Sequence, residues 1–254
     1  LSGQVTGLSD WDICIDPGHS QTENMGVNGY SEAEEVLRVG LHLQDIFLSQ
    51  TDIDTVYMTR TNDQQSVSLS QRTSYANSNG ASWFHSIHSN AGSSDNNNTL
   101  LLWGQLSDGT PDHPVGGEDM SDYMIDILTR TMRIPTIGSW GDCSFYTWSD
   151  YCDDSGGPYL YINRNTDMPS ELSEEGHHTN PPQNQLHMNE EYKRLLAYSF
   201  FWSILKYHEI DRPFVGISSG NISDIESGLP VNGAQVTMSG QTYTTDSYNS
   251  LFHI

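Results

Sequence analysis

The sequence predicts an α/β fold of three layers, in which helices cover both faces of a mixed, mostly parallel sheet. Two observations predict it. Short apolar or β-rich runs alternate along the chain with longer stretches whose apolar residues recur at helical spacing. After Pro213 this alternation stops, and Gly, Ser and Thr become frequent between short alternating runs. We therefore expect a short C-terminal all-β segment beside the α/β fold.

The individual elements follow from their local patterns. We expect strands over 12–16, 55–60, 83–88, 100–103, 159–164 and 168–175. We expect helices over 32–49, 67–78, 118–133 and 190–209, and a loop rich in Gly, Ser and Asp over roughly 138–158. The change of pattern near Pro213 divides the chain into residues 1–212 and residues 213–254.

The charge is strongly negative, with 33 acidic and 10 basic residues and a net charge of −23. Such a surface repels phosphate groups, which argues against nucleic acids and anionic membranes as partners. The acidic excess is explained equally well by a saline habitat and by simple solubility. No run approaches the roughly 20 apolar residues that cross a bilayer, so we expect no membrane span.

The three cysteines fall into two groups. Cys14 lies in the apolar run Ile13-Cys14-Ile15 and is expected to be a buried small side chain. Cys143 and Cys152 flank a short stretch that resembles a loop, and an oxidising compartment would allow them to form a disulfide.

Two histidines stand at the ends of predicted strands, His19 in Asp-Pro-Gly-His and His88 in Ser-Ile-His-Ser-Asn. A hydrolytic zinc site needs three protein ligands and one open position, and histidine is a typical donor. A packed or surface histidine is the alternative for each of them. Spacing alone therefore gives a metal site as a hypothesis.

Several ordered segments carry a more specific signal. These are ICIDPGH (13–19), NGYSEAEEVLRVGLHL (28–43), TVYMTRTNDQQSVSLSQRTSYANS (55–78), WFHSIHSN (83–90) and YINRNTDMPSELSEEGHHTN (161–180). Together they resemble the zinc-dependent N-acetylmuramoyl-L-alanine amidase family, which hydrolyses the bond between sugar and peptide in peptidoglycan. The resemblance covers about residues 11–208. It implies that residues 1–212 are a zinc amidase catalytic domain.

The resemblance also implies a ligand set for Zn²⁺. His19 matches the first ligand, Glu32 the second and His88 the third. Glu34 and Glu35 are alternatives for the second position, and a solvated first helical turn is the ordinary explanation for acidic residues there.

Glu174 matches the catalytic glutamate, in a register set by Pro169 and Gly176. Glu175 is the alternative, although strand alternation directs neighbouring side chains to opposite faces. His177 replaces a residue that is commonly apolar in the family, and either lines the cleft or belongs to an ordinary loop, as does His178.

Three further residues have supporting roles in this comparison. Arg60 and Arg72 resemble structural arginines of the family, and Asn90 is expected to support His88 from outside the ligand shell.

The function that the resemblance implies is hydrolysis of the amide between N-acetylmuramic acid and L-alanine. The expected partner is peptidoglycan or a muropeptide, outside the cytoplasm, and a protein regulator is compatible with this interpretation. Another zinc cell-wall peptidase and a non-catalytic peptidoglycan-binding protein are the alternatives. Residues 214–254 resemble the opening half of a carboxypeptidase-regulatory-like β-sandwich.

Overall fold

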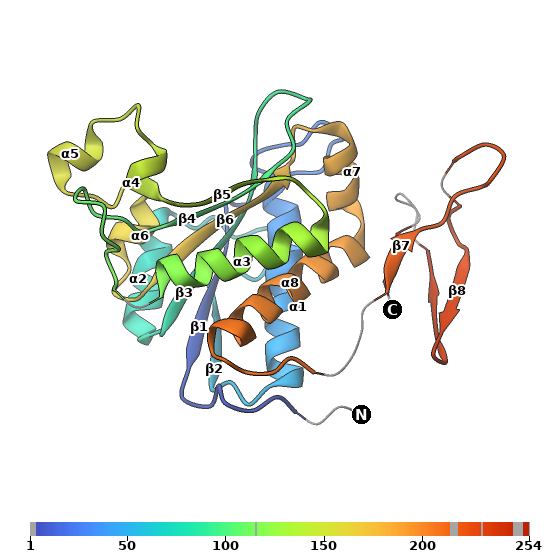
Figure 1. Ribbon diagram of the computed structural model, residues 1–254, viewed down its shortest axis with the longest axis horizontal. Coiled ribbons are helices and arrows are strands. Elements are labelled where there is room, and N and C mark those ends of the chain that lie inside the picture. The colour runs from blue at the N-terminus through green and yellow to red at the C-terminus, as the bar shows by residue number, and fades with distance from the viewer. Residues whose placement is uncertain (1–3, 115, 214–217, 230, 246–250, 254) are drawn as a thin grey trace.

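The main body of the protein is a six-stranded sheet between two helical layers (Figure 1). The computed structural model describes residues 4–114, 116–213, 218–229, 231–245 and 251–253. The strand order is β2-β1-β3-β6-β4-β5, and β4 against β6 is the antiparallel pairing of this sheet. The predicted fold class, a mixed and mostly parallel sheet with helices on both faces, is confirmed.

The strands of this sheet are short. They are β1 (Asp12–Pro17), β2 (Thr55–Met58), β3 (Trp83–Asn90), β4 (Thr99–Trp103), β5 (Thr136–Gly141) and β6 (Ser170–His177). The helices of the same body are α1 (Glu32–Gln50), α2 (Leu69–Asn79), α3 (Gly117–Met132), α4 (Asp142–Phe145), α5 (Tyr151–Ser155), α6 (Tyr161–Asn165), α7 (Pro181–Met188) and α8 (Glu190–Tyr207).

The two faces of the sheet carry separate cores. Ile13 and Ile15 of β1 pack into the larger core with α1, α3 and α8, whereas Cys14 between them packs into the smaller core with α2 and α6. The same alternation separates Leu101 of β4 from its neighbours Leu100 and Leu102. This period of two places alternate side chains of each strand on opposite faces.

Helix α1 begins where its sequence forms a capping box. The Ser31 side chain accepts a hydrogen bond from the backbone N–H of Glu34, and the Glu34 side chain accepts one from the backbone N–H of Ser31. These bonds satisfy backbone donors that the first turn leaves free. The cap fixes Glu32 as the first residue of the helix, which the predicted helix over 32–49 anticipated.

One predicted strand is wrong. Residues 159–164 bend into the short helix α6, and Ile162 is buried in the smaller core with Ala76 of α2. The alternation in Tyr-Leu-Tyr-Ile-Asn resembles a strand, but both edges of β6 are already paired, with β3 and β4. A short apolar run does not distinguish a strand from a helical turn.

Four other elements lie where no strand or helix was expected. The predicted loop over 138–158 includes most of β5, as well as α4 and α5. β5 is an edge strand with largely accessible side chains, so it lacks the apolar pattern of a buried strand. α7 begins at Asn180, whose side chain caps it, followed by prolines in its first turn, and this start signal was available in the sequence.

Two cysteines form a disulfide and the third is a buried free thiol, as their sequence positions predict. Cys143 and Cys152 form a disulfide with a Cα–Cα distance of 5.8 Å. Cys14 is a free and fully buried thiol. The disulfide closes the segment that joins α4 and α5.

The C-terminal segment consists of β-structure. β7 (Ser219–Asn221) pairs antiparallel with β10 (Leu251–His253), and β8 (Gln235–Met238) pairs antiparallel with β9 (Gln241–Thr244). The all-β character is confirmed. The domain boundary at residue 212 and the β-sandwich resemblance stay predictions.

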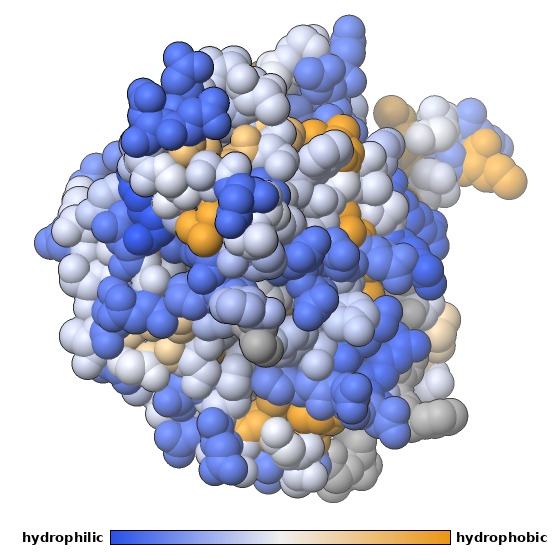
Figure 2. Space-filling model, turned by 60° about the vertical axis from the view of Figure 1, so that its left-hand side comes forward, coloured by the Kyte–Doolittle hydropathy of each residue, from blue (hydrophilic) through white to orange (hydrophobic). Residues whose placement is uncertain are grey.

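One face of the molecule is mainly hydrophilic. Figure 2 shows one face on which hydrophobic residues occur only in small scattered groups. Among the described residues, no helix is long and apolar enough to cross a membrane.

The packing of α1 gives a testable prediction. Leu43 is fully buried in the larger core, whereas Leu48 on the same helix is 57% exposed. We expect Leu43→Ala to lower the free energy of unfolding by about 2–5 kcal/mol, because it removes buried methyl groups and leaves a cavity. The matched variant Leu48→Ala should change it by less than about 0.5 kcal/mol. Urea denaturation of both variants measures the difference, and equal losses would contradict this packing.

Candidate metal and catalytic site

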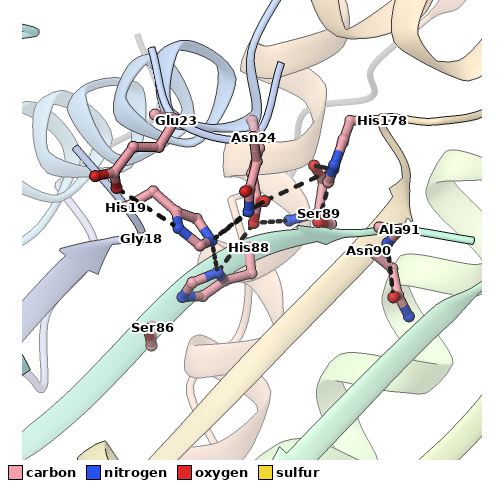
Figure 3. A network of polar contacts seen from close by, with 12 residues as sticks. Gly18, His19, Glu23, Asn24, Ser86, His88, Ser89, Asn90, Ala91 and His178 are labelled. Carbon is pink, nitrogen blue, oxygen red and sulfur yellow. Dashed lines mark hydrogen bonds and ion pairs between the residues drawn. The ribbon is translucent and has the colours of Figure 1, made fainter. Parts of the chain in front are cut away.

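Three predicted ligands meet beside the ends of β1 and β3. His19 follows β1, Glu32 begins α1 and His88 lies near the end of β3. His19 Nε2 is 3.2 Å from Glu32 Oε2, and His88 Nδ1 is 2.9 Å from Glu32 Oε1. The two imidazole nitrogens are 3.1 Å apart, and Figure 3 shows the two rings converging. The structure therefore brings these residues together from three separate elements.

The position of His19 depends on a strained turn. Its φ is 57°, in the left-handed region that side chains with a Cβ rarely adopt. The Arg72 guanidinium donates a hydrogen bond to the backbone carbonyl of His19. The Arg60 guanidinium donates to the carbonyls of Pro17 and Gly18, at 3.0 Å and 2.8 Å. Both arginines are buried, so the resemblance placed them correctly as structural residues.

Asp16 anchors Arg72 from the preceding strand. Its Oδ1 accepts hydrogen bonds from Arg72 Nη1 and from the Thr59 hydroxyl, each at 2.6 Å, and its Oδ2 accepts one from Ser86 Oγ at 2.8 Å. Burial alone would raise the pKa of Asp16. The positive charge of Arg72 and these hydrogen bonds outweigh burial and hold the pKa below its ordinary value.

Glu32 is 2% exposed and lies at the centre of the polar contacts. Its carboxylate also accepts hydrogen bonds from the Asn24 side chain at 2.7 Å and from the backbone N–H of Ser89 at 2.9 Å. His178 Nδ1 lies 3.6 Å from it. Burial alone would raise the Glu32 pKa, but hydrogen bonds from His19 and His88 hold it well below its ordinary value. The carboxylate is therefore ionised.

This donor set suits a zinc ion. His19, Glu32 and His88 each offer a ligand atom, and these atoms all lie within 4.8 Å of one another. Two imidazole nitrogens and one carboxylate oxygen are donors that Zn²⁺ binds in hydrolytic sites, where a fourth position stays open. The side chains of His19 and His88 are 29% and 17% exposed, so an incoming molecule can reach them from solvent.

Glu174 lies next to this group on the neighbouring strand. It is opposite His88 in the parallel register of β3 and β6. Its Oε2 is buried and has no hydrogen-bond partner. Burial, followed by the negative charges of Glu32 and Glu35, raises the pKa of Glu174 well above its ordinary value. A raised pKa makes this carboxylate a stronger proton acceptor than an ordinary glutamate.

The alternative glutamates have other environments. Glu34 caps α1 through Ser31. Glu35 is 1% exposed and lies beside Glu175 and His187 rather than beside His19. Glu175 accepts a hydrogen bond from the Tyr192 hydroxyl at 2.5 Å, on the face of β6 opposite to Glu174. The geometry thus favours Glu32 and Glu174 over their neighbours.

The supporting residues differ from the prediction. Asn90 directs its side-chain oxygen to the backbone N–H of Ala91, away from the His88 ring (Figure 3). Its predicted contact with His88 is wrong, because the register of β3 against β6 shifts between these residues. Asn24 and Ser89 contact Glu32 instead, and no local motif indicates either residue. His177 is buried and lies 3.3 Å from the Asn98 side-chain oxygen.

A family model described as N-acetylmuramoyl-L-alanine amidase matches residues 13–206. The chain belongs to this amidase family. The match spans the sheet from β1 to β6 and includes all four candidate site residues.

Curated relatives match over a shorter stretch. The N-acetylmuramoyl-L-alanine amidase CwlM of Bacillus licheniformis is 44% identical over 81 residues, which is 32% of each chain. The sporulation-specific N-acetylmuramoyl-L-alanine amidase of Bacillus subtilis strain 168 is 40% identical over 81 residues, 32% of this chain and 31% of the relative. The aligned part thus spans about a third of these relatives.

Solved structures share the fold. The catalytic domain of CwlV from Bacillus (Paenibacillus) polymyxa var. colistinus has a TM-score of 0.64 at 20% identity, over 79% of this chain and 99% of that chain. An amidase of Clostridium difficile 630 has a TM-score of 0.65 at 22% identity, over 78% and 97%. CwlD of Clostridioides difficile, in complex with the GerS lipoprotein, has a TM-score of 0.61 at 19% identity, over 78% and 98%.

The arginine contacts give a second prediction. Arg72→Met removes one partner of a buried ion pair and leaves Asp16 uncompensated, so we expect the free energy of unfolding to fall by about 3–5 kcal/mol. The matched variant Arg38→Met breaks the half-exposed pair with Asp63, and we expect a loss of at most about 1 kcal/mol. Chemical denaturation measures both. A loss for Arg72→Met no larger than for Arg38→Met would show that the buried pair does not support the His19 turn.

Proposed function

We propose that this chain is a zinc-dependent N-acetylmuramoyl-L-alanine amidase, which hydrolyses the amide between N-acetylmuramic acid and L-alanine in peptidoglycan. The observation that carries the proposal is the convergence of His19, Glu32 and His88, with Glu174 beside His88 on the next strand. Family membership over residues 13–206 supports the same substrate class.

In this proposal His19, Glu32 and His88 hold the zinc ion. When bound, zinc polarises the scissile carbonyl and acidifies the attacking water. The chain supplies the geometry: the buried arginines fix the His19 turn, and Asn24 and Ser89 orient the Glu32 carboxylate. Such outer contacts orient the ligands before substrate arrives.

Glu174 is the proposed general base. It takes the proton of the attacking water and returns a proton to the departing amine of L-alanine. The water oxygen becomes part of the new carboxylate, and the amide C–N bond breaks. The buried, unpartnered Oε2 of Glu174 is free for this exchange. Since Glu175 faces the other side of β6, it does not share this role.

The proposed setting is outside the cytoplasm. The Cys143–Cys152 disulfide supports it, because disulfides persist mainly in oxidising compartments. The complex of the similar amidase CwlD with a lipoprotein makes a protein regulator of this chain a reasonable proposal as well.

Product analysis tests the proposed reaction. Purified protein is incubated with peptidoglycan, and the products are identified by mass spectrometry. The proposal predicts free stem peptides that begin with L-alanine, together with glycan whose muramic acid is intact. Cleavage within the stem peptide would instead assign the protein to the zinc peptidases, and intact wall would assign it a binding role.

The role of Glu174 gives a third prediction. We expect Glu174→Gln to lower the rate of peptide release by a factor of about 10²–10⁴, because it removes the general base. Zinc content, measured by mass spectrometry of the metal, should stay unchanged. The exposed control Glu118→Gln should retain full activity. Normal turnover by Glu174→Gln would exclude this assignment.

Metal removal gives a fourth prediction. Dialysis against a chelator should abolish peptide release, and added Zn²⁺ should restore it, because the acidified water is lost with the ion. Peptide release that persists in the fully chelated protein would contradict a zinc mechanism.

A further inference from the structure

Exposed aromatic side chains gather at one end of the sheet, on β5 and on the segment that follows it. Trp148 is 71% exposed, and Trp140 of β5 is 46% exposed. Single exposed apolar side chains are common on protein surfaces, whereas a group of large ones marks a surface that binds a partner. The helices α4 and α5, which flank Trp148 in the chain, lie beyond the end of β5, at the upper left of Figure 1.

Trp148 is held in place by other rings. The centroid of its indole lies 5.9 Å from that of Phe145 and 5.2 Å from that of Tyr146, and both pairs meet edge to face. Tyr146 in turn stacks on Tyr159 at a centroid distance of 4.1 Å. Aromatic pairs prefer such geometries. The outer surface of the indole is therefore presented to solvent in a fixed orientation.

The segment that carries these rings is anchored to the body of the protein. Asp142 is fully buried, and its carboxylate accepts hydrogen bonds from the backbone N–H groups of Gln105 and Leu160, at 3.2 Å and 2.9 Å. It also accepts one from the Asn163 side chain at 3.0 Å. The disulfide closes the same segment. A surface ordered in advance loses little conformational entropy when a ligand binds.

Trp140 and Glu174 lie on the same face of the sheet. Trp140 is opposite Leu102 of β4, and Leu102 is opposite Leu172 of β6. Leu102 and Leu172 both belong to the smaller core. Glu174 follows Leu172 by two residues, so its side chain points to this face as well.

The indole of Trp140 extends towards the row of residues that contains Glu174. In this row Glu174 is opposite Leu100, and Leu100 is opposite Gly138 of β5. Trp140 Nε1 donates a hydrogen bond to the Ile137 carbonyl at 2.7 Å, and a Cβ at Gly138 would lie 3.0 Å from the same nitrogen. The indole thus lies over Gly138, whose backbone is two strand spacings, or about 10 Å, from that of Glu174.

Tyr146 links the ring cluster to the candidate catalytic site. It packs against the smaller core, which includes Leu100, the residue opposite Glu174. Burial in the first place, and then the charge of Glu174, raise the pKa of Tyr146 to about 12. The Tyr146 hydroxyl is therefore near enough to Glu174 for the carboxylate charge to act on it.

Rings of this kind suit the flat faces of sugars. The face of an aromatic ring carries partial negative charge, which attracts the weakly positive C–H groups of a sugar ring. Contact between the two also removes apolar area from water. The glycan of peptidoglycan is a strand of N-acetylated sugars, and its muramic acid carries no charge while the stem peptide is attached through the amide.

The charge of this surface favours the glycan over the stem peptide. Asp150, Asp153 and Asp154 are exposed in the segment that carries Trp148. The neighbouring guanidinium of Arg164 donates to backbone carbonyls and lies 4.6 Å over a tyrosine ring, so it is held within the protein. A stem peptide ends in a free carboxylate, which the exposed acidic groups repel, whereas neutral sugars are not repelled.

We propose that Trp140, Tyr146 and Trp148 form a subsite that binds the neutral glycan strand of peptidoglycan by stacking against its sugar rings. The separation of about 10 Å between Glu174 and Gly138 corresponds to one further sugar along the strand, beside the muramic acid that is cleaved. The inference rests on the proposed amidase function, because it adds a substrate subsite beside the same catalytic residues.

Glycan binding tests the subsite without catalysis. The probe is the β-1,4-linked tetramer of N-acetylglucosamine, which carries no peptide, titrated calorimetrically into the full chain with a chelator present. We expect Trp140→Ala and Trp148→Ala each to weaken binding about tenfold, because each removes a stacked ring. The matched control Tyr123→Ala removes an exposed ring from α3, on the other face of the sheet, and should leave the affinity unchanged. A wild type that does not bind the tetramer, or equal affinities in all the variants, overturns the proposal.

A second measurement uses the wild type alone, in case a variant does not fold. In NMR spectra the tetramer should shift the indole N–H signals of Trp140 and Trp148, whereas a free stem peptide should leave them in place. Shifts caused by the peptide and not by the tetramer overturn the proposal.

Peptide release separates this proposal from the proposed function. The substrates are a soluble glycan fragment of several disaccharides that carry stem peptides, and a single N-acetylmuramic acid that carries the same peptide. We expect Trp140→Ala to lower kcat/KM about tenfold for the fragment and to leave it unchanged for the single sugar. Equal losses on both substrates overturn the subsite. If the wild type releases peptide from neither substrate, the proposed function fails, and tetramer binding still decides the subsite.

Discussion

The buried ion pair between Asp16 and Arg72 is the interaction on which the candidate catalytic site depends. The turn after β1 must carry His19 back towards α1, and it does so with His19 in a left-handed backbone conformation. Glycine would adopt this conformation at no steric cost, but glycine cannot bind a metal. The strain is balanced by the hydrogen bonds that Arg72 and Arg60 donate to the carbonyls of the turn. Asp16 lies on β1, just before this turn, and supplies the negative charge that keeps Arg72 buried.

The alternation along β6 organises the rest of the chemistry. Consecutive glutamates face opposite sides of the sheet, Glu174 beside His88 and Glu175 beneath α7 and α8. A strongly acidic chain thereby places carboxylates in two separate buried environments. In both, the negative charge is adjacent to histidine, which explains how a protein of net charge −23 tolerates carboxylates in its interior.

Much of the fold could be predicted from the sequence, whereas Glu32 and Glu174 of the candidate site came only from the family resemblance. The apolar runs and helical periodicities located most strands and helices, because each buried strand and amphipathic helix has its own period. His19 and His88 could be found because both follow apolar strands. The helix α6 was mistaken for a strand, since the six residues 159–164 are too few to fix a period. The buried role of Glu35 could not be found, because its partners Glu175 and His187 are distant in sequence and meet only through the sheet.

The central claim is that His19, Glu32 and His88 bind zinc. Anomalous diffraction from crystals of the zinc-loaded protein, recorded on both sides of the zinc absorption edge, tests it most directly. The account predicts a zinc peak within bonding distance of Glu32 and of the imidazole nitrogens of His19 and His88, with Glu174 beside it. Zinc peaks found only elsewhere in the molecule, with these three side chains still hydrogen-bonded to one another, would contradict it.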